Sequence, residues 1–497
     1  MKTEEKRSIK STILECREVL EKDIEQVLIN YGIYVDKVWI NIDDLENLTE
    51  EQKFTRGKIE NVIAKYEKGG FSKDKAVKEY IKEVSYTYLN RLAALRVMEV
   101  RGLIDEILIP RNEYGNRSFM SSRFYEVARE YCKYQMDGGL SFLLTLVFEE
   151  ISKEINMLFN MEDEYSLIFP SNEALLEVIQ LLCNEIDEES WKQDEIIGWI
   201  YQYFNDKEKD DVFDRLYNKK EKIKVEDIPA ATQLFTPDWI VDWIVDNSLG
   251  TLWQEIKEGK REYEGIEKIK LLDPCCGSGH FLVKAYDMFY QMYKEEGYNE
   301  EKIPFLILEH NIYGIDIDLR AVQLTGLILY IKTKTYLKQG GFDTNIKGKM
   351  QVNLVCADAI LLNGTRLEAL KEKHKDNKYV LEMIDIIYEE FEDVRLKGSL
   401  IQPEKRLRPL KEKAIEEDDK NREAKSKRIA KKQEKNQIDM LGNFDDYDMG
   451  KSFSRADVEL AESLKLIYQE AVKANDMSRQ LFANEATKSV QLVNIFM

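Results

Sequence analysis

The pattern of apolar and polar positions divides the chain into three parts. Up to about residue 228, apolar residues recur at spacings of three and four with few glycines, which is the period of amphipathic helices. From 229 to 400, short apolar runs alternate with longer helical stretches. Beyond residue 400 charged residues dominate. We therefore predict a helical N-terminal domain over 1–228, a second domain over 229–400 and a charged helical or linker segment over 401–497.

The second part contains three candidate strands, over residues 266–272, 312–317 and 352–355. Helical stretches lie between them, and this alternation is typical of a parallel sheet with right-handed crossovers. The fold class predicted is α/β. Asp273, Asp316 and Asp358 each fall at or near the C-terminal end of a candidate strand. Open parallel sheets bind their ligands at that edge, so these aspartates are candidate ligand contacts.

A glycine-containing turn follows the first candidate strand. Residues 271–281 read Leu-Leu-Asp-Pro-Cys-Cys-Gly-Ser-Gly-His-Phe and open into a helical pattern. Glycines let the backbone approach a ligand closely, the helix N-terminus offers free N–H groups, and an acidic residue on the next strand can accept bonds from ribose hydroxyls. The dinucleotide fingerprint is incomplete, because Leu282 occupies its third glycine position. The turn therefore favours a nucleotide-like ligand other than NAD or FAD.

The turn resembles motif I of the S-adenosylmethionine (AdoMet)-dependent DNA methyltransferases that modify exocyclic amino groups, typically Asp-Pro-x-x-Gly-Ser-Gly-x-Phe. Residues 232–237, Thr-Gln-Leu-Phe-Thr-Pro, resemble the segment that precedes this loop in permuted adenine methyltransferases. Farther upstream, residues 90–96 and 195–204 resemble the N-terminal region of BREX phage-defence methyltransferases of the PglX type. The resemblance covers roughly residues 80–400.

This resemblance implies a helical N-terminal domain followed by a partial Rossmann-like methyltransferase domain with AdoMet as cofactor. Gly277 and Gly279 would pass under the methionine and ribose portions, while Phe281 would pack the turn onto the sheet. Asp273 would orient the loop or the ammonium group of the cofactor. The implied cofactor-binding residues are Thr236, Pro237, Asp273, Gly277, Gly279, Phe281, Asp316 and Asp358.

The remaining aspartates are given specific roles by the same resemblance. Asp316 would accept bonds from the ribose hydroxyls, and Asp358 would read the adenine amino group of the cofactor. Asp318 lies two residues after Asp316, on the same side of an extended strand. Each has a structural alternative, because aspartate is a common helix N-cap at a strand-to-helix turn.

The catalytic residues are unassigned. Adenine methyltransferases of this type carry an Asn-Pro-Pro-Tyr or Asn-Pro-Pro-Phe motif that holds a flipped adenine, and this sequence has no Pro-Pro pair and no proline after Pro409. We expect a truncated or split part of a site-specific, adenine-specific DNA methyltransferase of phage defence or restriction-modification, inactive without the missing C-terminal part. The alternatives are a non-catalytic AdoMet- or DNA-binding subunit of a defence complex and a methyltransferase acting on RNA or protein.

Composition and charge narrow the list of partners. The net charge of −20 argues against nonspecific phosphate binding over the whole surface, but it leaves room for a local basic cleft. We expect double-stranded DNA, a polypeptide supplying the rest of the methyltransferase and other defence-system proteins as partners. The missing strands would pair at the sheet edge beyond the candidate strand 352–355. No apolar stretch approaches membrane-spanning length and no signal peptide is recognisable, so we expect no membrane contact and a cytoplasmic protein. Three histidines and unpaired cysteine spacings suggest no metal site.

Two arginines in the helical part have alternative interpretations. Arg91 and Arg96 lie five residues apart near Tyr86 and Tyr88. They could contact nucleic acid, but the favoured interpretation is that they snorkel on a packed helix, with their apolar stems buried and their guanidinium groups in water.

Overall fold

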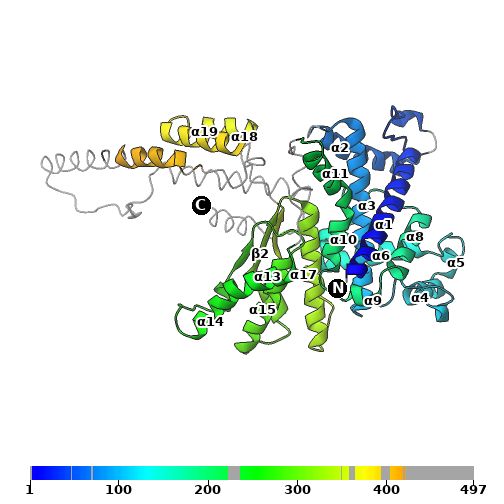
Figure 1. Ribbon diagram of the computed structural model, residues 1–497. Helices are drawn as coiled ribbons and strands as arrows, with labels where there is room; N and C mark the ends of the chain where they lie inside the picture. The colour runs from blue at the N-terminus through cyan, green and yellow to red at the C-terminus, as the bar shows by residue number, and fades with distance from the viewer. Residues whose placement is uncertain are drawn as a thin grey trace, which may run out of the picture. The chain divides into compact units, whose positions relative to one another are not determined.

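A computed structural model describes residues 3–45, 48–68, 71–221, 236–346, 348, 350–356, 364–392, 403, 405–417 and 420 (Figure 1). The chain divides into two compact units, Met1–Cys356 and Ala357–Met497, and each is described by itself.

The first unit begins with helices that run up to residue 217. The α-helices are α1 (Thr3–Asn30), α2 (Glu50–Lys68), α3 (Lys73–Val100), α4 (Phe119–Val127), α5 (Arg129–Cys132), α6 (Leu140–Glu154), α7 (Asn156–Phe159), α8 (Asn172–Asn184), α9 (Glu188–Trp191), α10 (Ile196–Phe204) and α11 (Asp206–Tyr217), with short 3₁₀ turns η1 (Ile42–Asp44) and η2 (Asn112–Tyr114). We call residues 3–221 the helical part.

Helix α3 forms the centre of the helical part. It packs against α1, α2, α8 and α10, and almost every residue from Tyr80 to Glu99 is buried. A helix that is enclosed on all sides must satisfy its own polar side chains internally. Arg91 does so by donating to the carbonyl oxygens of Leu158 at 2.7 Å and Asn160 at 3.0 Å.

The two arginines flagged in the sequence are therefore structural. Arg91 is fully buried, and Arg96, 2% exposed, pairs with Glu99 at 3.2 Å. Neither guanidinium reaches the surface, so the nucleic-acid interpretation of these residues is wrong. The helix is packed as expected, but the two side chains do not snorkel to water, because their guanidinium groups find partners in the interior.

The second part of this unit alternates helices and strands. Its elements are α13 (Asp238–Val245), η4 (Asp246–Gly250), α14 (Thr251–Lys257), η5 (Ile266–Lys268), β1 (Leu271–Asp273), α15 (His280–Glu295), α16 (Ile303–Leu306), η6 (Ile307–Asn311), β2 (Ile312–Asp316), α17 (Leu319–Gln339) and β3 (Asn353–Cys356).

The three strands form a parallel sheet in the order β1-β2-β3. Asp273 is in register with Gly314, and Asp316 is in register with Cys356. Helix α15 packs on β1 and β2, and α17 packs on β2 and β3. The structure is thus mostly helical with a small parallel sheet, which agrees with the predicted α/β class at that level.

Helix α17 lies between the sheet and the helical part (Figure 1). Besides β2 and β3 it contacts α7 and α10, and nearly every residue from Ala321 to Lys334 is buried. This one helix therefore joins the sheet to the preceding helices.

The first predicted strand was wrong over its first half. Residues 266–268 form the 3₁₀ turn η5, and β1 starts only at Leu271. The side-chain amide of Asn311 donates to the carbonyl oxygens of Ile266 and Ile269, each at 2.8 Å. Because both carbonyl oxygens accept from one side chain, this segment does not form strand hydrogen bonds with β2, and the pairing of β1 with β2 begins at Leu271. The other two candidate strands are confirmed to within one residue at each end.

The second unit contains α18 (Gly364–Lys373), α19 (Lys378–Glu392) and a helical stretch over residues 405–417. These helices share a small apolar core, formed by Leu367, Leu370, Val380, Met383, Ile384, Leu410 and Ala414.

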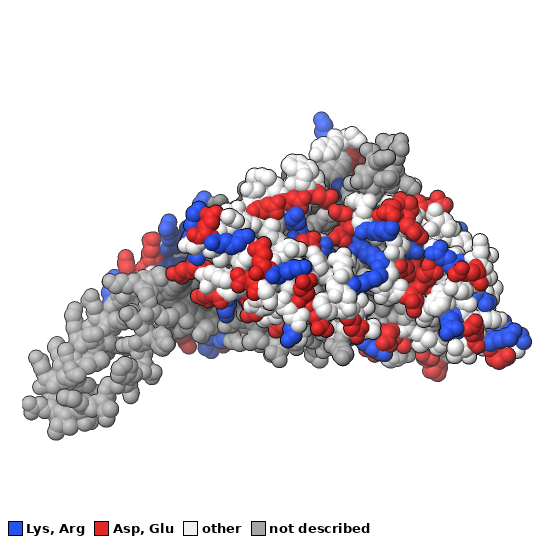
Figure 2. All heavy atoms as spheres, turned by 90° about the horizontal axis from the view of Figure 1, so that it is seen from below, with Lys and Arg blue, Asp and Glu red and all other residues white. Residues whose placement is uncertain are grey.

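The surface carries both charge signs. On the face shown in Figure 2, acidic and basic side chains of the described residues are interspersed, and no continuous basic area is visible there. Within the described ranges, every helix is too short or too polar to cross a membrane.

Candidate functional site

The glycine turn, residues 274–279, connects β1 to α15 and is held by hydrogen bonds on two sides. The N–H of Cys276 donates to Ile315 O on β2 at 2.8 Å. On the other side, the hydroxyl of Thr325 on α17 donates to Gly277 O at 2.8 Å. The turn therefore sits at the C-terminal edge of the sheet, where the strand ends predicted a ligand site.

Asp316, the last residue of β2, holds the same turn through its carboxylate. One oxygen accepts the N–H of Gly277 and the other accepts the N–H of Asp318, both at 2.8 Å. Burial raises the pKa of Asp316, while these two backbone bonds oppose that shift. Asp316 thus links the end of β2 to the turn that follows β1.

Asp273, the last residue of β1, has an unused acceptor. Its Oδ1 accepts the N–H of Cys275 at 3.1 Å, whereas its Oδ2 is buried and has no hydrogen-bond partner. Burial raises the pKa of Asp273, and the nearby charge of Asp316 raises it further. A buried carboxylate oxygen without a donor is costly. A ligand that brings hydroxyl, amino or ammonium donors to this edge would relieve that cost.

The two glycines of the turn differ in their surroundings. Both have left-handed backbone, with φ of +52° at Gly277 and +87° at Gly279. A Cβ built on Gly277 meets nothing within 4 Å, but one built on Gly279 comes within 2.8 Å of the Thr325 Cγ2 atom. Gly277 therefore borders open space, while Gly279 permits close packing on α17 as well as forming the N-cap of α15.

Thr236 and Pro237 lie immediately before α13, with Pro237 at its N-cap. Helix α13 packs on α15, and Asp238 lies 4.0 Å from the His280 Nδ1 atom at the start of α15. Burial lowers the pKa of His280, so this is not an ion pair at neutral pH. The contact brings the partly exposed Thr236 and the exposed Pro237 to the same end of α15 as the glycine turn.

The remaining predicted residues have different outcomes. Phe281 is partly exposed, whereas its neighbour Leu282 is fully buried. The Leu282 side chain packs so close to Gly314 on β2 that a Cβ built on this glycine would come within 2.8 Å of the Leu282 Cδ1 atom. Leu282 therefore packs the start of α15 onto this strand. Asp358 lies outside the described residues.

Sequence reasoning missed Thr325, and it left the role of Asp318 open. Thr325 occupies the second turn of α17 without any motif around it, so no sequence signal pointed to its bond with the glycine turn. Asp318 caps α17 by accepting the N–H of Arg320 at 2.9 Å. Its position, just before an apolar helical run, was the available signal for the capping alternative.

Comparison with known proteins agrees with the predicted resemblance. A family model described as "MmeI, DNA-methyltransferase domain" matches residues 251–382. This range includes β1, the glycine turn, β2 and β3.

The chain is also similar to three curated proteins. It is 31% identical over 375 residues to the adenine-specific methyltransferase BrxX of Escherichia coli O9:H4 (strain HS), covering 65% of this chain and 30% of that protein. It is 28% identical to the adenine-specific methyltransferase PglX of Lacticaseibacillus casei (strain Zhang), covering 66% and 33%. It is 24% identical to the type II restriction enzyme and methyltransferase RM.Eco57I of Escherichia coli, covering 60% and 29%. The predicted resemblance to PglX-type methyltransferases is thus confirmed, and the chain spans about a third of the length of these relatives.

Proposed function

We propose that the chain supplies the AdoMet-binding portion of an adenine-specific DNA methyltransferase that acts in phage defence or restriction-modification. One observation carries this proposal. The buried Oδ2 atom of Asp273 has no hydrogen-bond donor, and the turn that follows it borders open space at Gly277. AdoMet has the matching groups, namely an ammonium group and two ribose hydroxyls. The similarity to BrxX and PglX supports the same reaction class.

The proposed contacts follow from where the side chains end. Asp316 retains acceptor capacity beyond its two backbone bonds, because each carboxylate oxygen has two acceptor sites. It would accept the ribose hydroxyls, and Asp273 would accept the ammonium group. Gly277 would let the turn lie under the ligand, with Gly279 and Phe281 supporting it. When bound, AdoMet would supply an electrophilic methyl group.

Two further residues complete the proposed pocket. Thr236 and Pro237 would border the methionine end, since α13 starts beside the start of α15. Asp358, which follows β3 in the sequence, would read the adenine amino group of the cofactor.

The proposed fold is Rossmann-like. Three parallel strands in consecutive order, joined through α15 and α17, support one half of a doubly wound sheet. Such a sheet continues on the outer edge of its first strand, and ligands bind where the strand order reverses. The further strands would therefore pair with β1. In this proposal the helical domain covers residues 1–228, the cofactor-binding domain covers 229–400, and 401–497 is a charged helical or linker segment.

The proposed partners are double-stranded DNA, a polypeptide region carrying the Asn-Pro-Pro-Tyr type of motif, and other proteins of the defence system, all in the cytoplasm. A second candidate function is an AdoMet- or DNA-binding subunit without catalysis. The absence of that motif from these 497 residues favours the second candidate for the chain acting by itself.

Calorimetric titration with AdoMet, and with NAD as the competing ligand class, tests the proposal. We expect saturable binding of AdoMet and of its demethylated product, and none of NAD. Binding of NAD alone, or of neither ligand, would contradict it.

A further inference from the structure

The turn that carries Asp316 continues into a cluster of buried charges. Asp318, whose N–H is held by Asp316, caps α17 and accepts the Arg320 Nε–H at 3.1 Å. Only Ile317 separates Asp316 from Asp318 in the chain, so the carboxylate of the proposed cofactor site adjoins this cluster.

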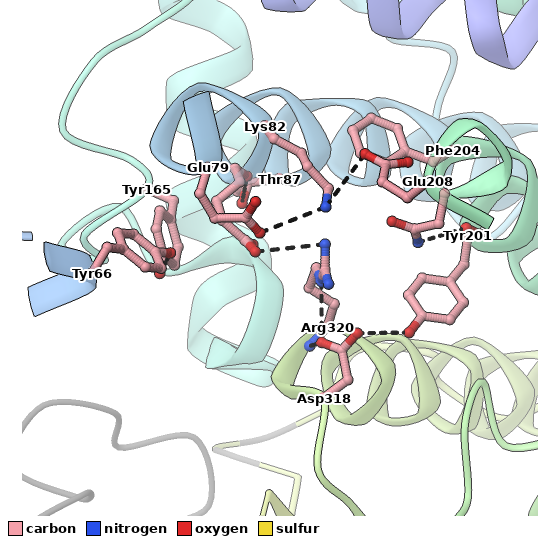
Figure 3. Close-up of polar contacts among 12 residues, drawn as sticks. Tyr66, Glu79, Lys82, Thr87, Tyr165, Tyr201, Phe204, Glu208, Asp318 and Arg320 are labelled. Carbon is pink, nitrogen blue, oxygen red and sulfur yellow. Dashed lines mark hydrogen bonds and ion pairs between the residues drawn. The ribbon is translucent and has the colours of Figure 1, made fainter. Parts of the chain in front are cut away.

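Two helices of the helical part hold the cluster. The hydroxyl of Tyr201 on α10 donates to the Asp318 Oδ2 atom at 2.8 Å. The Arg320 Nη1 atom lies 3.5 Å from the Glu83 Oε1 atom on α3, as an ion pair without hydrogen-bond geometry. Figure 3 shows Arg320 and Asp318 at the start of α17, with Tyr201 facing the carboxylate.

The Arg320 guanidinium lies within 3.5 Å of both carboxylates of this cluster, and the three charged groups are largely shielded from water. The side chains of Glu83, Asp318 and Arg320 are 13%, 14% and 15% exposed. Burial would raise the pKa of Asp318, but the Arg320 charge and its hydrogen bond outweigh burial and lower it. Buried ion pairs contribute little net stability, and their best-attested use is to select one geometry.

We infer that Arg320 is a positioning residue for the proposed AdoMet site. It fixes the turn from Asp316 to Asp318 against the helical part. By doing so it sets the place of the carboxylate that would bind ribose and that also holds Gly277. The inference rests on the proposed function for its ligand, and it assigns the helical part a share in cofactor affinity.

Helix α17 offers a matched control. Lys332 lies on the same helix, about 18 Å farther along its axis. Its Nζ is 2.6 Å from Asp194 Oδ2 and 2.9 Å from Asp287 Oδ2, and its side chain is 11% exposed. It is thus an equally buried cation between two carboxylates, far from the glycine turn.

The first test compares Arg320→Met with Lys332→Met in the full chain. Both should lower stability in urea denaturation. We expect Arg320→Met to weaken AdoMet binding roughly 3- to 30-fold, the range for indirect coupling between sites, and Lys332→Met to leave it unchanged. Arg320→Lys should recover part of the affinity. Equal affinity losses in both Met variants would overturn the inference.

Hydrogen exchange provides a readout that needs no ligand. The amides of Gly277 and Asp318 are both held by Asp316, so Arg320→Met should speed their exchange and Lys332→Met should not. If the unmodified chain binds no AdoMet, the proposed function fails, and this exchange comparison still decides whether Arg320 positions the turn.

A pH profile separates positioning from mere stability. Burial raises the pKa of Glu83 to about 7, against the opposing charge of Arg320. The other groups facing Glu83 are Glu79 and Lys82 on α3, Asp318 on α17, Tyr66 on α2 and Tyr86 on α3. As pH falls through 7, protonation neutralises one partner of Arg320, so AdoMet affinity should fall.

The contribution of Glu83 to folding stability has the opposite pH dependence to the expected AdoMet affinity. With a raised pKa, the folded state binds more protons than the unfolded state between the ordinary carboxyl pKa of 4.5 and about 7, so stability decreases as pH rises over this window. In Glu83→Gln, the fall of AdoMet affinity near pH 7 should disappear. Any titration of AdoMet itself affects the unmodified chain and this variant equally, so it does not contribute to the difference between them. Superimposable affinity profiles of the two proteins would overturn the positioning role.

Discussion

The carboxylate of Asp316 accepts the backbone N–H of Gly277 at 2.8 Å, across the gap between the end of β2 and the turn that follows β1. Asp316 therefore fastens the end of β2 to that turn, whereas the helix N-cap that the sequence left open is formed by Asp318. The Asp316 side chain keeps acceptor capacity for a ligand. A substitution of Asp316 must therefore be tested for its effect on the stability of the fold and on the affinity for AdoMet.

Replacing Asp316 with alanine should weaken AdoMet binding by roughly 1–3 kcal/mol, because charge-assisted bonds are lost. Stability should also fall, since Gly277 and Asp318 each lose the acceptor of a backbone N–H. Asp316→Asn keeps one acceptor oxygen and should cost less stability. Calorimetry and urea denaturation of both variants check this. Unchanged affinity in both would make Asp316 purely structural.

Gly277→Asn should reduce AdoMet affinity by at least about tenfold, because it places a side chain in the open space where the ligand must approach. Asparagine tolerates left-handed backbone better than most residues, so the fold should survive. The readout is calorimetric titration with AdoMet.

Gly341→Asn is the control for this variant. Gly341 has φ of +73° and nothing within 4 Å of a built Cβ, yet it lies at the far end of α17. It should show a similar small stability change with no loss of affinity. A substitution at Gly279 would be less informative, because its contact with Thr325 would disturb the packing as well.

The helical part should lose stability in acid through Glu208. Burial alone would raise the pKa of Glu208, but the hydrogen bond from Arg17 and the charge of Lys82 lower it to about 2. A depressed pKa stabilises the fold above the unfolded value, near 4.5, and this contribution disappears as pH falls toward 2. It amounts to roughly 3 kcal/mol at neutral pH.

Urea denaturation of the unmodified chain and of Glu208→Gln between about pH 7 and pH 3 measures this contribution. The difference between the two proteins should be largest at neutral pH and should shrink steadily below pH 4.5. A difference that is constant with pH would mean that the Arg17 pair does not depend on the charge of Glu208.

The purified chain alone should not methylate DNA, because its sequence lacks the motif that holds and stacks a flipped adenine in similar enzymes. Adding a polypeptide with that motif and a recognition region should produce methyl transfer if the two associate. From the sequence we expected this association beyond β3. The strand order makes the outer edge of β1 the better candidate in a doubly wound sheet.

Transfer of a radiolabelled methyl group to DNA is the measurement. Asp316→Ala in the reconstituted pair serves as the negative control. Methyl transfer by the chain without any added polypeptide would require a different set of catalytic residues.

The sequence alone determined the features that depend on neighbouring residues. The glycine turn, the strand ends at Asp273 and Asp316, and the helix that opens after Gly279 are local patterns. A strand, a turn and a helix in succession place their ends at one edge of a parallel sheet, so the sequence pattern by itself places these residues together.

Only the tertiary structure decided what the remaining polar residues do. Asn311 bends a segment 45 residues away, Thr325 binds a turn 48 residues earlier, and Tyr201 reaches Asp318 across 117 residues. Only the packing around α3 showed that the Arg91 guanidinium is buried and donates to backbone carbonyl oxygens. Contacts between such distant positions have no period or spacing in the sequence, because they arise when separately formed helices and strands are packed together. Burial then determines which partner each polar group must find.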